Sequence, residues 1–161
     1  MKVYFASDHA GYELKNALIE YVRSLGYEVE DLGPHTYDAN DDYPITIEPL
    51  AVAIANSEGP ESIEGQEKIA HQTDVCGIII GGSGQGEAIV ANRHEGVRAI
   101  EYYGGDLEIV VLGREHNDAN VLSLGARFIS VDEAKQAVKY FLETPFSEDV
   151  RHVRRIKEID K

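Results

Sequence analysis

The sequence has little cysteine, no tryptophan and few positive charges. Its one cysteine, Cys76, excludes an intramolecular disulfide and is typical of a chain that stays in a reducing compartment. It carries 15 Lys and Arg against 29 Asp and Glu, a formal net charge of −14. Nucleic acids and anionic membranes attract basic surfaces, so neither is an expected partner.

Long apolar runs are also absent. No segment approaches the roughly 18 apolar residues that a membrane span requires. The apolar residues 3–6 end at Ser7-Asp8, so no signal peptide is visible either. We therefore expect a soluble protein of the cytoplasm. At 161 residues, the chain is long enough for one domain, 1–161, with a three-layer core.

The chain alternates between short apolar segments and segments with helical periodicity. The expected strands are 3–6, 27–32, 75–80, 97–101 and 120–124. The expected helices are 14–25, 45–55, 86–93, 104–114, a helix capped by Ser130 and Glu133, and 148–159. This order predicts the α/β class, namely a three-layer α/β/α Rossmann-like sandwich with a five-stranded parallel sheet.

One segment, residues 56–74, departs from this alternation. It is polar, acidic and contains glycine, and few of its residues are apolar. We expect a surface insertion here, with a short helix around 64–71.

The most informative motif is Gly-Gly-Ser-Gly-Gln-Gly-Glu at residues 81–87, between an expected strand and an expected helix. Glycines let backbone N–H groups approach an anion closely, and a helix N-terminus favours negative charge. The loop also carries the Ser83 hydroxyl and the Glu87 carboxylate. A carboxylate beside such a loop is suited to act as a general base, so we expect chemistry on a small oxygenated anion.

A nucleotide site is the alternative for this loop. The loop lacks the Gly-Lys-Ser/Thr ending of a Walker A motif. Gly82, Gly84 and Gly86 give G-x-G-x-G, with Glu87 where a dinucleotide fingerprint has its third glycine. The spelling therefore disfavours dinucleotide binding.

Asp8 and His9 follow the first expected strand. Ligands of open parallel sheets bind outside the carboxyl ends of the strands, so this pair should neighbour the glycine loop. A helix cap by Ser7 or Asp8 is the alternative. An imidazole at a strand end can bind phosphate or move a proton.

Two further polar segments could take part in chemistry. His116 could serve as an acid and Asn117 could bind a hydroxyl, although both could also belong to an ordinary polar loop. Arg151 and Arg155 are four residues apart, which suits a phosphate on one helical face, although a solvated final helix is equally compatible. The histidines show no His-x-x-x-His pair and Cys76 lies in a strand, so no metal is expected.

Together these segments resemble the family of ribose-5-phosphate isomerase B and its sugar-phosphate isomerase relatives. The segments that carry the resemblance, in order along the chain, are 7–11, 42–44, 81–87 with 91–92, 115–120, and the Arg-His-x-x-Arg run 151–155. The resemblance implies a cofactor-free aldose–ketose isomerase that interconverts D-ribose 5-phosphate and D-ribulose 5-phosphate. The reaction opens the furanose ring and passes through a 1,2-enediolate.

The resemblance also implies residue roles. Many members carry a catalytic cysteine at the position of Gly81, and a subgroup uses a glutamate at the position of Glu87. Because this chain has Gly81, the resemblance implies Glu87 rather than Cys76 as the base. His116 would open the ring with help from Asp8, and Ser83 would stabilise the oxyanion. The implied substrate-binding residues are His9, Tyr43, Gly82, Gly84, Gly86, Asn117, Arg127, Arg151 and Arg155.

Members of this family are dimers or tetramers, so the resemblance implies a homodimer or larger homo-oligomer. The site would be shared between subunits, with Asn117 and Arg127 acting across the interface. Three alternatives stay open at this point. They are an isomerase of a six-carbon sugar phosphate such as allose 6-phosphate or galactose 6-phosphate, a non-catalytic phosphosugar sensor, and a nicotinamide-dependent reductase.

Overall fold

Five strands form one sheet in the computed structural model, which describes residues 1–57 and 75–159. The strands are β1 (Lys2–Ser7), β2 (Glu28–Asp31), β3 (Val75–Gly81), β4 (Ala99–Tyr102) and β5 (Val121–Gly125). They lie in the order β2-β1-β3-β5-β4, and every pair is parallel. The predicted five-stranded parallel sheet is therefore confirmed.

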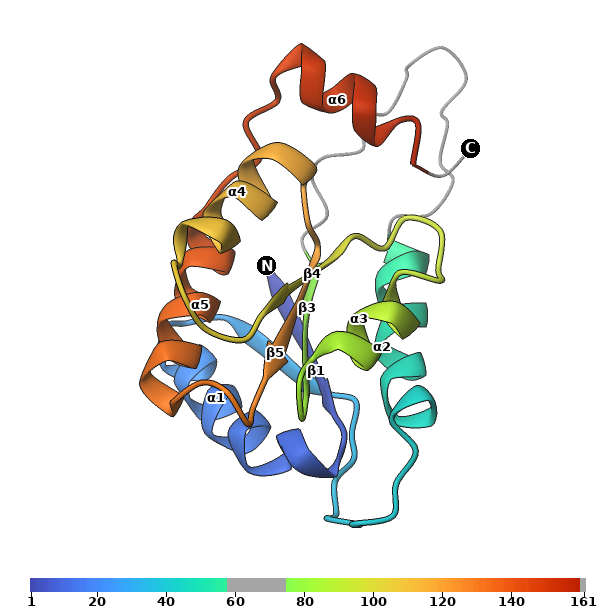
Figure 1. Ribbon diagram of the computed structural model, residues 1–161, viewed down its shortest axis with the longest axis vertical. Coiled ribbons are helices and arrows are strands. Elements are labelled where there is room, and N and C mark those ends of the chain that lie inside the picture. The colour runs from blue at the N-terminus through green and yellow to red at the C-terminus, as the bar shows by residue number, and fades with distance from the viewer. Residues whose placement is uncertain (58–74, 160–161) are drawn as a thin grey trace.

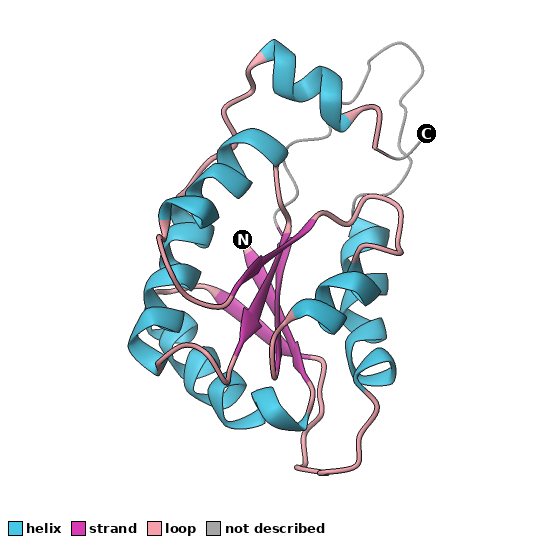
Figure 2. Ribbon diagram, viewed as in Figure 1, coloured by secondary structure: helices cyan, strands magenta, loops and turns pink. Residues whose placement is uncertain are grey.

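Helices cover both faces of this sheet (Figures 1 and 2). α1 (Tyr12–Ser24), α4 (Glu108–Asn117) and α5 (Val131–Glu143) lie on one face, and α2 (Tyr43–Ser57) and α3 (Gln85–Ala91) lie on the other. A short 3₁₀ helix, η1 (His9–Gly11), follows β1, and α6 (Val150–Ile156) lies at the opposite end of the sheet (Figure 1). The three-layer α/β/α arrangement is as predicted.

The central strand β3 explains how the layers are held together. Successive side chains of a strand point to opposite faces. Ile78 and Ile80 belong to the apolar core under α1 and α5, whereas Ile79 belongs to the core under α2 and α3. All three are fully buried, which accounts for the unbroken apolar run in the sequence.

Helix α5 begins as its sequence predicts. The Ser130 hydroxyl accepts a hydrogen bond from the Glu133 backbone N–H, and the Glu133 carboxylate accepts one from the Ser130 backbone N–H at 2.8 Å. This capping box satisfies two N–H groups that a helix start leaves free. The buried face of α5 consists of Ala134, Ala137, Val138, Phe141 and Leu142.

Helix α4 lies further along the chain than its predicted span of 104–114. Gly104 and Gly105 have φ values of +112° and +97°, so they form a turn instead of a helical start. The helix ends at Asp118, whose backbone is left-handed with φ of +47° and whose carboxylate lies 3.0 Å from Arg98 Nη2. His116 therefore lies in the last turn of a helix and not in a polar loop.

Helix α2 begins at Tyr43, two residues earlier than predicted. Pro44 lies in its first turn, where the missing N–H costs nothing and the fixed φ suits a helix. The predicted insertion at 56–74 lies almost wholly outside the described residues, since only 56 and 57 are described and both belong to α2. Across the described ranges, no helix combines the length and apolar character that crossing a membrane requires.

The order of strands reverses between β1 and β3. In sheets of this kind, the crevice outside the carboxyl ends of two such strands is the usual place for a ligand. The two strand ends are joined directly, because the backbone N–H of Asp8 donates to the carbonyl of Ile80 at 3.0 Å. The fold thus brings Asp8 and His9 next to the glycine loop, as predicted.

Candidate active site

The glycine loop turns sharply between β3 and α3. Gly84 has φ of +82°, a conformation that side chains other than glycine rarely adopt. Its carbonyl accepts a hydrogen bond from the Ser123 hydroxyl at 2.5 Å, which ties the loop to β5. The loop after β5 is tied as well, because the backbone N–H of Arg127 donates to the carbonyl of Gly82 at 3.1 Å. The loop is therefore held by neighbouring strand ends.

Glu87 folds back from the first turn of α3 onto the end of β3. A Cβ atom added to Gly81 would overlap the Glu87 carboxylate group. The carboxylate therefore occupies the space that a side chain at position 81 would fill, and only 4% of Glu87 is exposed. Glycine at 81 is what makes room for this carboxylate.

Burial raises the pKa of Glu87, and the negative charges of Asp8, Glu101 and Asp41 raise it further. The backbone N–H of Glu87 itself acts in the opposite direction. A carboxylate with a raised pKa binds a proton more tightly than an exposed glutamate does, so it is a better general base.

Asp8 is buried beside this carboxylate and also caps η1. Its Oδ1 atom accepts a hydrogen bond from the backbone N–H of Gly11 at 2.9 Å. The cap that was the alternative interpretation of Asp8 is therefore present. It uses one carboxylate oxygen, so it does not exclude a second role for the side chain. The adjacent His9 directs its Nδ1 atom to Asp41 Oδ1 at 2.6 Å.

Two more predicted residues lie against the glycine loop. A Cβ atom on Gly86 would be 2.8 Å from Tyr43 Cζ, and one on Gly82 would be 3.3 Å from Arg127 Cζ. These short distances show that a side chain at either glycine would crowd the tyrosine ring or the guanidinium. The glycines therefore leave room for Tyr43 and Arg127 to pack against the loop. The structure thus gathers one group at the carboxyl ends of the strands, here called the glycine-loop cluster: Asp8, His9, Tyr43, Ser83, Glu87 and Arg127.

The remaining predicted residues form a second group, here called the helix-end cluster: His116, Asn117, Arg151 and Arg155. His116 lies in the last turn of α4, with its ring centroid 4.4 Å from that of His152 on α6. His152 is buried, and its Nδ1 atom lies 3.0 Å from the Ser147 hydroxyl. The two arginines are exposed on the same short helix.

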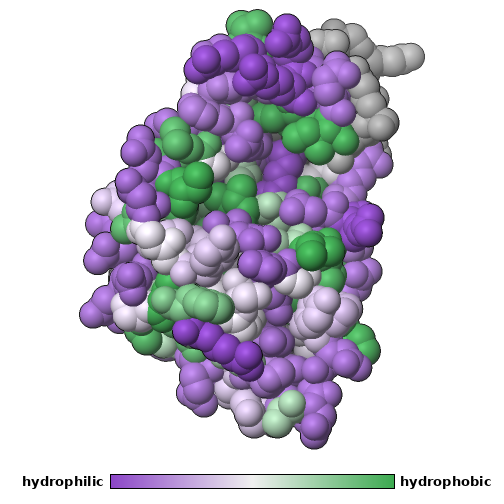
Figure 3. Space-filling model, in the orientation of Figure 1, coloured by the Kyte–Doolittle hydropathy of each residue, from purple (hydrophilic) through white to green (hydrophobic). Residues whose placement is uncertain are grey.

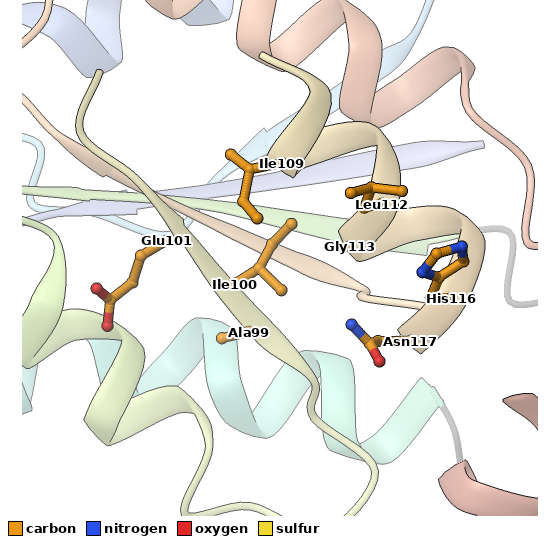
Figure 4. Close-up of a pocket in the computed structure, with 8 residues that line it drawn as sticks. All are labelled: Ala99, Ile100, Glu101, Ile109, Leu112, Gly113, His116 and Asn117. Atoms are coloured by element: carbon orange, nitrogen blue, oxygen red, sulfur yellow. The ribbon is translucent and has the colours of Figure 1, made fainter. Parts of the chain in front are cut away.

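His116 and Asn117 also line a shallow pocket of about 280 Å³ beside the edge strand β4 (Figure 4). Both come from the end of α4, and Glu101 of β4 points away from them at the far side of the pocket. The predicted catalytic residue His116 and the predicted substrate-binding residue Asn117 thus line a hollow on the surface rather than the glycine loop.

The two clusters lie at opposite ends of the sheet. Asn117 precedes the first residue of β5, whereas Arg127 follows its last residue. Five residues of extended strand span about 13 Å between first and last Cα. Within one chain, His116 and Asn117 are therefore not brought to Glu87, and Arg127 lies with the glycine loop of its own chain.

Cys76 belongs to the apolar core, as expected. It is 5% exposed, and burial raises the pKa of its thiol to about 12. The thiol is protonated at neutral pH, which makes it a poor nucleophile or base. Among the residues described, no group of His, Cys, Asp and Glu side chains is placed to hold a metal ion.

Three residues outside the two clusters interact with their members, and none of the three was assigned a role from the sequence. Asp41 is one of several aspartates in a polar loop, and nothing in the spacing distinguishes the one that contacts His9. Glu101 lies in β4, and nothing in the sequence shows that its charge acts on Glu87. His152 lay inside a recognised motif, yet its contact with His116 depends on how α6 packs against α4.

The chain is an α/β protein of the Rossmann-like class, a doubly wound parallel sheet with a buried carboxylate over a glycine loop at the strand ends where such sheets usually bind ligands. A family model described as Ribose/Galactose Isomerase matches residues 3–159. The chain belongs to the ribose/galactose isomerase family.

Curated relatives and solved structures agree with this family. The chain is 40% identical over 156 residues to ribose-5-phosphate isomerase B of Mycobacterium tuberculosis, covering 97% of this chain and 86% of the relative. It is 33% identical to the Escherichia coli protein of that name, covering 98% and 93%. A crystal structure of ribose-5-phosphate isomerase B from Mycoplasma genitalium with bound ribulose-5-phosphate has a TM-score of 0.84 at 34% identity, covering 98% and 93%.

The burial of Glu87 predicts a stability effect. Its pKa is raised in the folded state, so folding favours the protonated form, and stability is lost as pH rises from about 4.5 through the folded-state pKa. Glu87→Gln removes this loss. We expect the variant to be more stable than the parent at pH 7.5, with an advantage that shrinks toward pH 4. Urea unfolding at several pH values measures it, and a difference independent of pH would contradict the burial argument.

Proposed function

We propose that this protein interconverts D-ribose 5-phosphate and D-ribulose 5-phosphate, with Glu87 as the base that moves the proton. The observation that carries the proposal is the Glu87 carboxylate, buried against Gly81 with a raised pKa. The names of the relatives at 33–40% identity support the substrate. The bound ribulose-5-phosphate of the Mycoplasma genitalium structure supports it further.

The proposed proton transfer follows from the position of Glu87. The carboxylate removes the C2 proton of the open-chain aldose, and the electron pair forms a 1,2-enediolate. The same proton, or one exchanged with water, returns at C1 while the hydroxyl proton of O2 passes to O1, which gives the ketose. The Ser83 hydroxyl and the backbone N–H groups of 82–86 stabilise the negative oxygen. The hydrogen moves within one molecule, so the reaction needs no external oxidant or reductant.

Ring opening needs a second group, and here the separation of the two clusters matters. An acid must protonate the ring oxygen while a base takes a hydroxyl proton, roles we assign to His116 and Asp8. Because His116 and Glu87 lie at opposite ends of one chain, we propose that the partner subunit's His116 and the partner subunit's Asn117 complete each site. The apolar patches on the face of the β4 edge offer surface for such a contact (Figure 3). The exposed apolar side chains include Ile89, Tyr103, Ile109 and Phe128.

The substrate phosphate carries negative charge to a protein of net charge −14, so local cations must hold it. We assign this role to His9 and Arg127 of one chain, together with the partner subunit's Arg151 and the partner subunit's Arg155. Tyr43, against Gly86, is proposed as a contact to the sugar. A phosphosugar sensor could keep these cations but has no need for a buried base. The proposal also places this metabolic enzyme in the cytoplasm.

Turnover tests the proposed reaction. We expect the purified protein to convert ribose 5-phosphate to ribulose 5-phosphate without added metal or cofactor. Glu87→Gln should lower kcat by about 10²–10⁴-fold, the usual contribution of a positioned acid–base group. Ketose formation measured by absorbance gives both rates.

Cys76→Ala is the matched control, because it removes the only thiol while leaving the glycine loop intact. We expect its kcat to stay within about twofold of the parent, since a buried thiol takes no part in proton transfer. Comparable losses in both variants would exclude Glu87 as the specific base. Turnover of allose 6-phosphate in preference to the pentose would keep the mechanism and exclude the proposed substrate.

Subunit mixing tests the shared site. Glu87→Gln and His116→Asn should each be inactive alone. In a mixed dimer both substitutions fall in the same site, and the other site is intact. Random assembly from equal amounts should therefore restore about a quarter of the parental activity, as two-fold symmetry requires.

The control mixes each variant with itself under the same refolding or co-expression conditions, which should restore nothing. A site contained within one chain gives no recovery in the mixed sample either. Absence of recovery, with mixed dimers demonstrated by mass spectrometry, would contradict the shared site.

A further inference from the structure

Asp41 contacts His9 across 32 residues of sequence. The distance between His9 Nδ1 and Asp41 Oδ1 is 2.6 Å. An ionised carboxylate only accepts hydrogen bonds, so the ring nitrogen carries the hydrogen in this contact. The Asp41 side chain is 9% exposed, whereas the His9 side chain is 29% exposed. Asp41 is thus the more buried partner of the pair.

The loop that carries Asp41 is fixed at its start. Lys15 is fully buried, and its Nζ atom donates to both carboxylate oxygens of Asp31, at 2.6 and 2.7 Å, and to the carbonyl of Pro34 at 2.8 Å. The backbone N–H of Ser7 donates to the carbonyl of Gly33 at 3.1 Å. These contacts tie the loop to α1 and β1 on either side of His9. The end of the loop is fixed one residue after Asp41, because the carbonyl of Asp42 accepts a hydrogen bond from the backbone N–H of Ile45 in α2 at 2.9 Å.

The charges around His9 favour its protonated form. The hydrogen bond to Asp41 raises the pKa of His9, and the nearby charges of Asp8 and Asp41 raise it further. Burial and the charge of Arg127 act in the opposite direction. The second oxygen of Asp41 is buried and has no hydrogen-bond partner among the residues described. Within the described part of the chain, the hydrogen bond from His9 is therefore the main interaction that offsets the burial of the Asp41 carboxylate.

We propose that Asp41 is a positioning residue for phosphate binding, which holds the His9 ring by Nδ1 and leaves Nε2–H to donate to a phosphate oxygen. This inference rests on the proposed function, because it assumes that His9 binds the phosphate of the substrate. A charged imidazole held in place donates a stronger hydrogen bond than a neutral, freely rotating one. It also loses less side-chain entropy when the phosphate binds.

A purely structural role for Asp41 predicts something different. If Asp41 only held the loop, its loss would lower stability and kcat without any link to the charge of His9. If it acts through His9, its loss must weaken phosphate binding most where the normal His9 is charged and the altered His9 is neutral. An unperturbed imidazole loses its charge near pH 6.5. The loss should therefore be larger at pH 7.5 than at pH 6.

The test uses Asp41→Asn, which keeps the size of the side chain and removes its charge. We expect KM for ribose 5-phosphate to rise about tenfold at pH 7.5 and less at pH 6, with kcat within about twofold. NMR titration of the imidazole signals should show a lower pKa for His9 in the variant. The dissociation constant for inorganic phosphate should rise in parallel with KM. A loss that is the same at both pH values, or a fall in kcat alone, would overturn the proposal.

Asp38→Asn is the matched control, because Asp38 lies in the same loop but its Oδ1 atom accepts from the backbone N–H of Asn40. It removes the same charge, and we expect neither His9 nor KM to change. In a His9→Asn background, Asp41→Asn should have no further effect on KM. If the parent protein fails to turn over ribose 5-phosphate, the proposed function is wrong. The phosphate titration still decides whether Asp41 acts through His9.

Discussion

A carboxylate buried against a glycine backbone is the constraint on which the rest of this site depends. Glu87 can lie over the end of β3 only because residue 81 has no side chain. That position removes the carboxylate from water and surrounds it with Asp8, Glu101 and Asp41, so its pKa is raised. These carboxylates repel a phosphate, so binding one requires cations. His9 and Arg127 lie beside the glycine loop and can supply positive charge.

The parallel sheet fixes which groups can meet within one chain. All five strands run the same way, so groups that follow strands gather at one end and groups that precede them gather at the other. Glu87 is in the first set, and His116, at the end of α4, is in the second. A two-fold partner that turns one end of the sheet toward the other end of its neighbour is a direct way to unite them. This geometry is the physical basis for proposing a shared site.

Much of the fold could be predicted because the signals are local. The apolar run of β3 and the capping box of α5 each fix their own element. The predicted start of α4 was wrong, because hydrophobic periodicity does not distinguish the left-handed turn at Gly104 and Gly105 from the first residues of a helix. The contacts of His9 with Asp41 and of His116 with His152 could not be predicted, since each depends on how two distant elements pack.

The most direct test of Glu87 as the base follows the hydrogen at C2. Ribose 5-phosphate is incubated with the protein in D₂O and watched by proton NMR. Transfer through an enediolate predicts that deuterium enters C2 of the recovered aldose and C1 of the ketose, so that the proton signals at these carbons decrease. In Glu87→Gln almost no deuterium should enter at either carbon. Turnover and deuterium incorporation that are unchanged in Glu87→Gln would contradict the account.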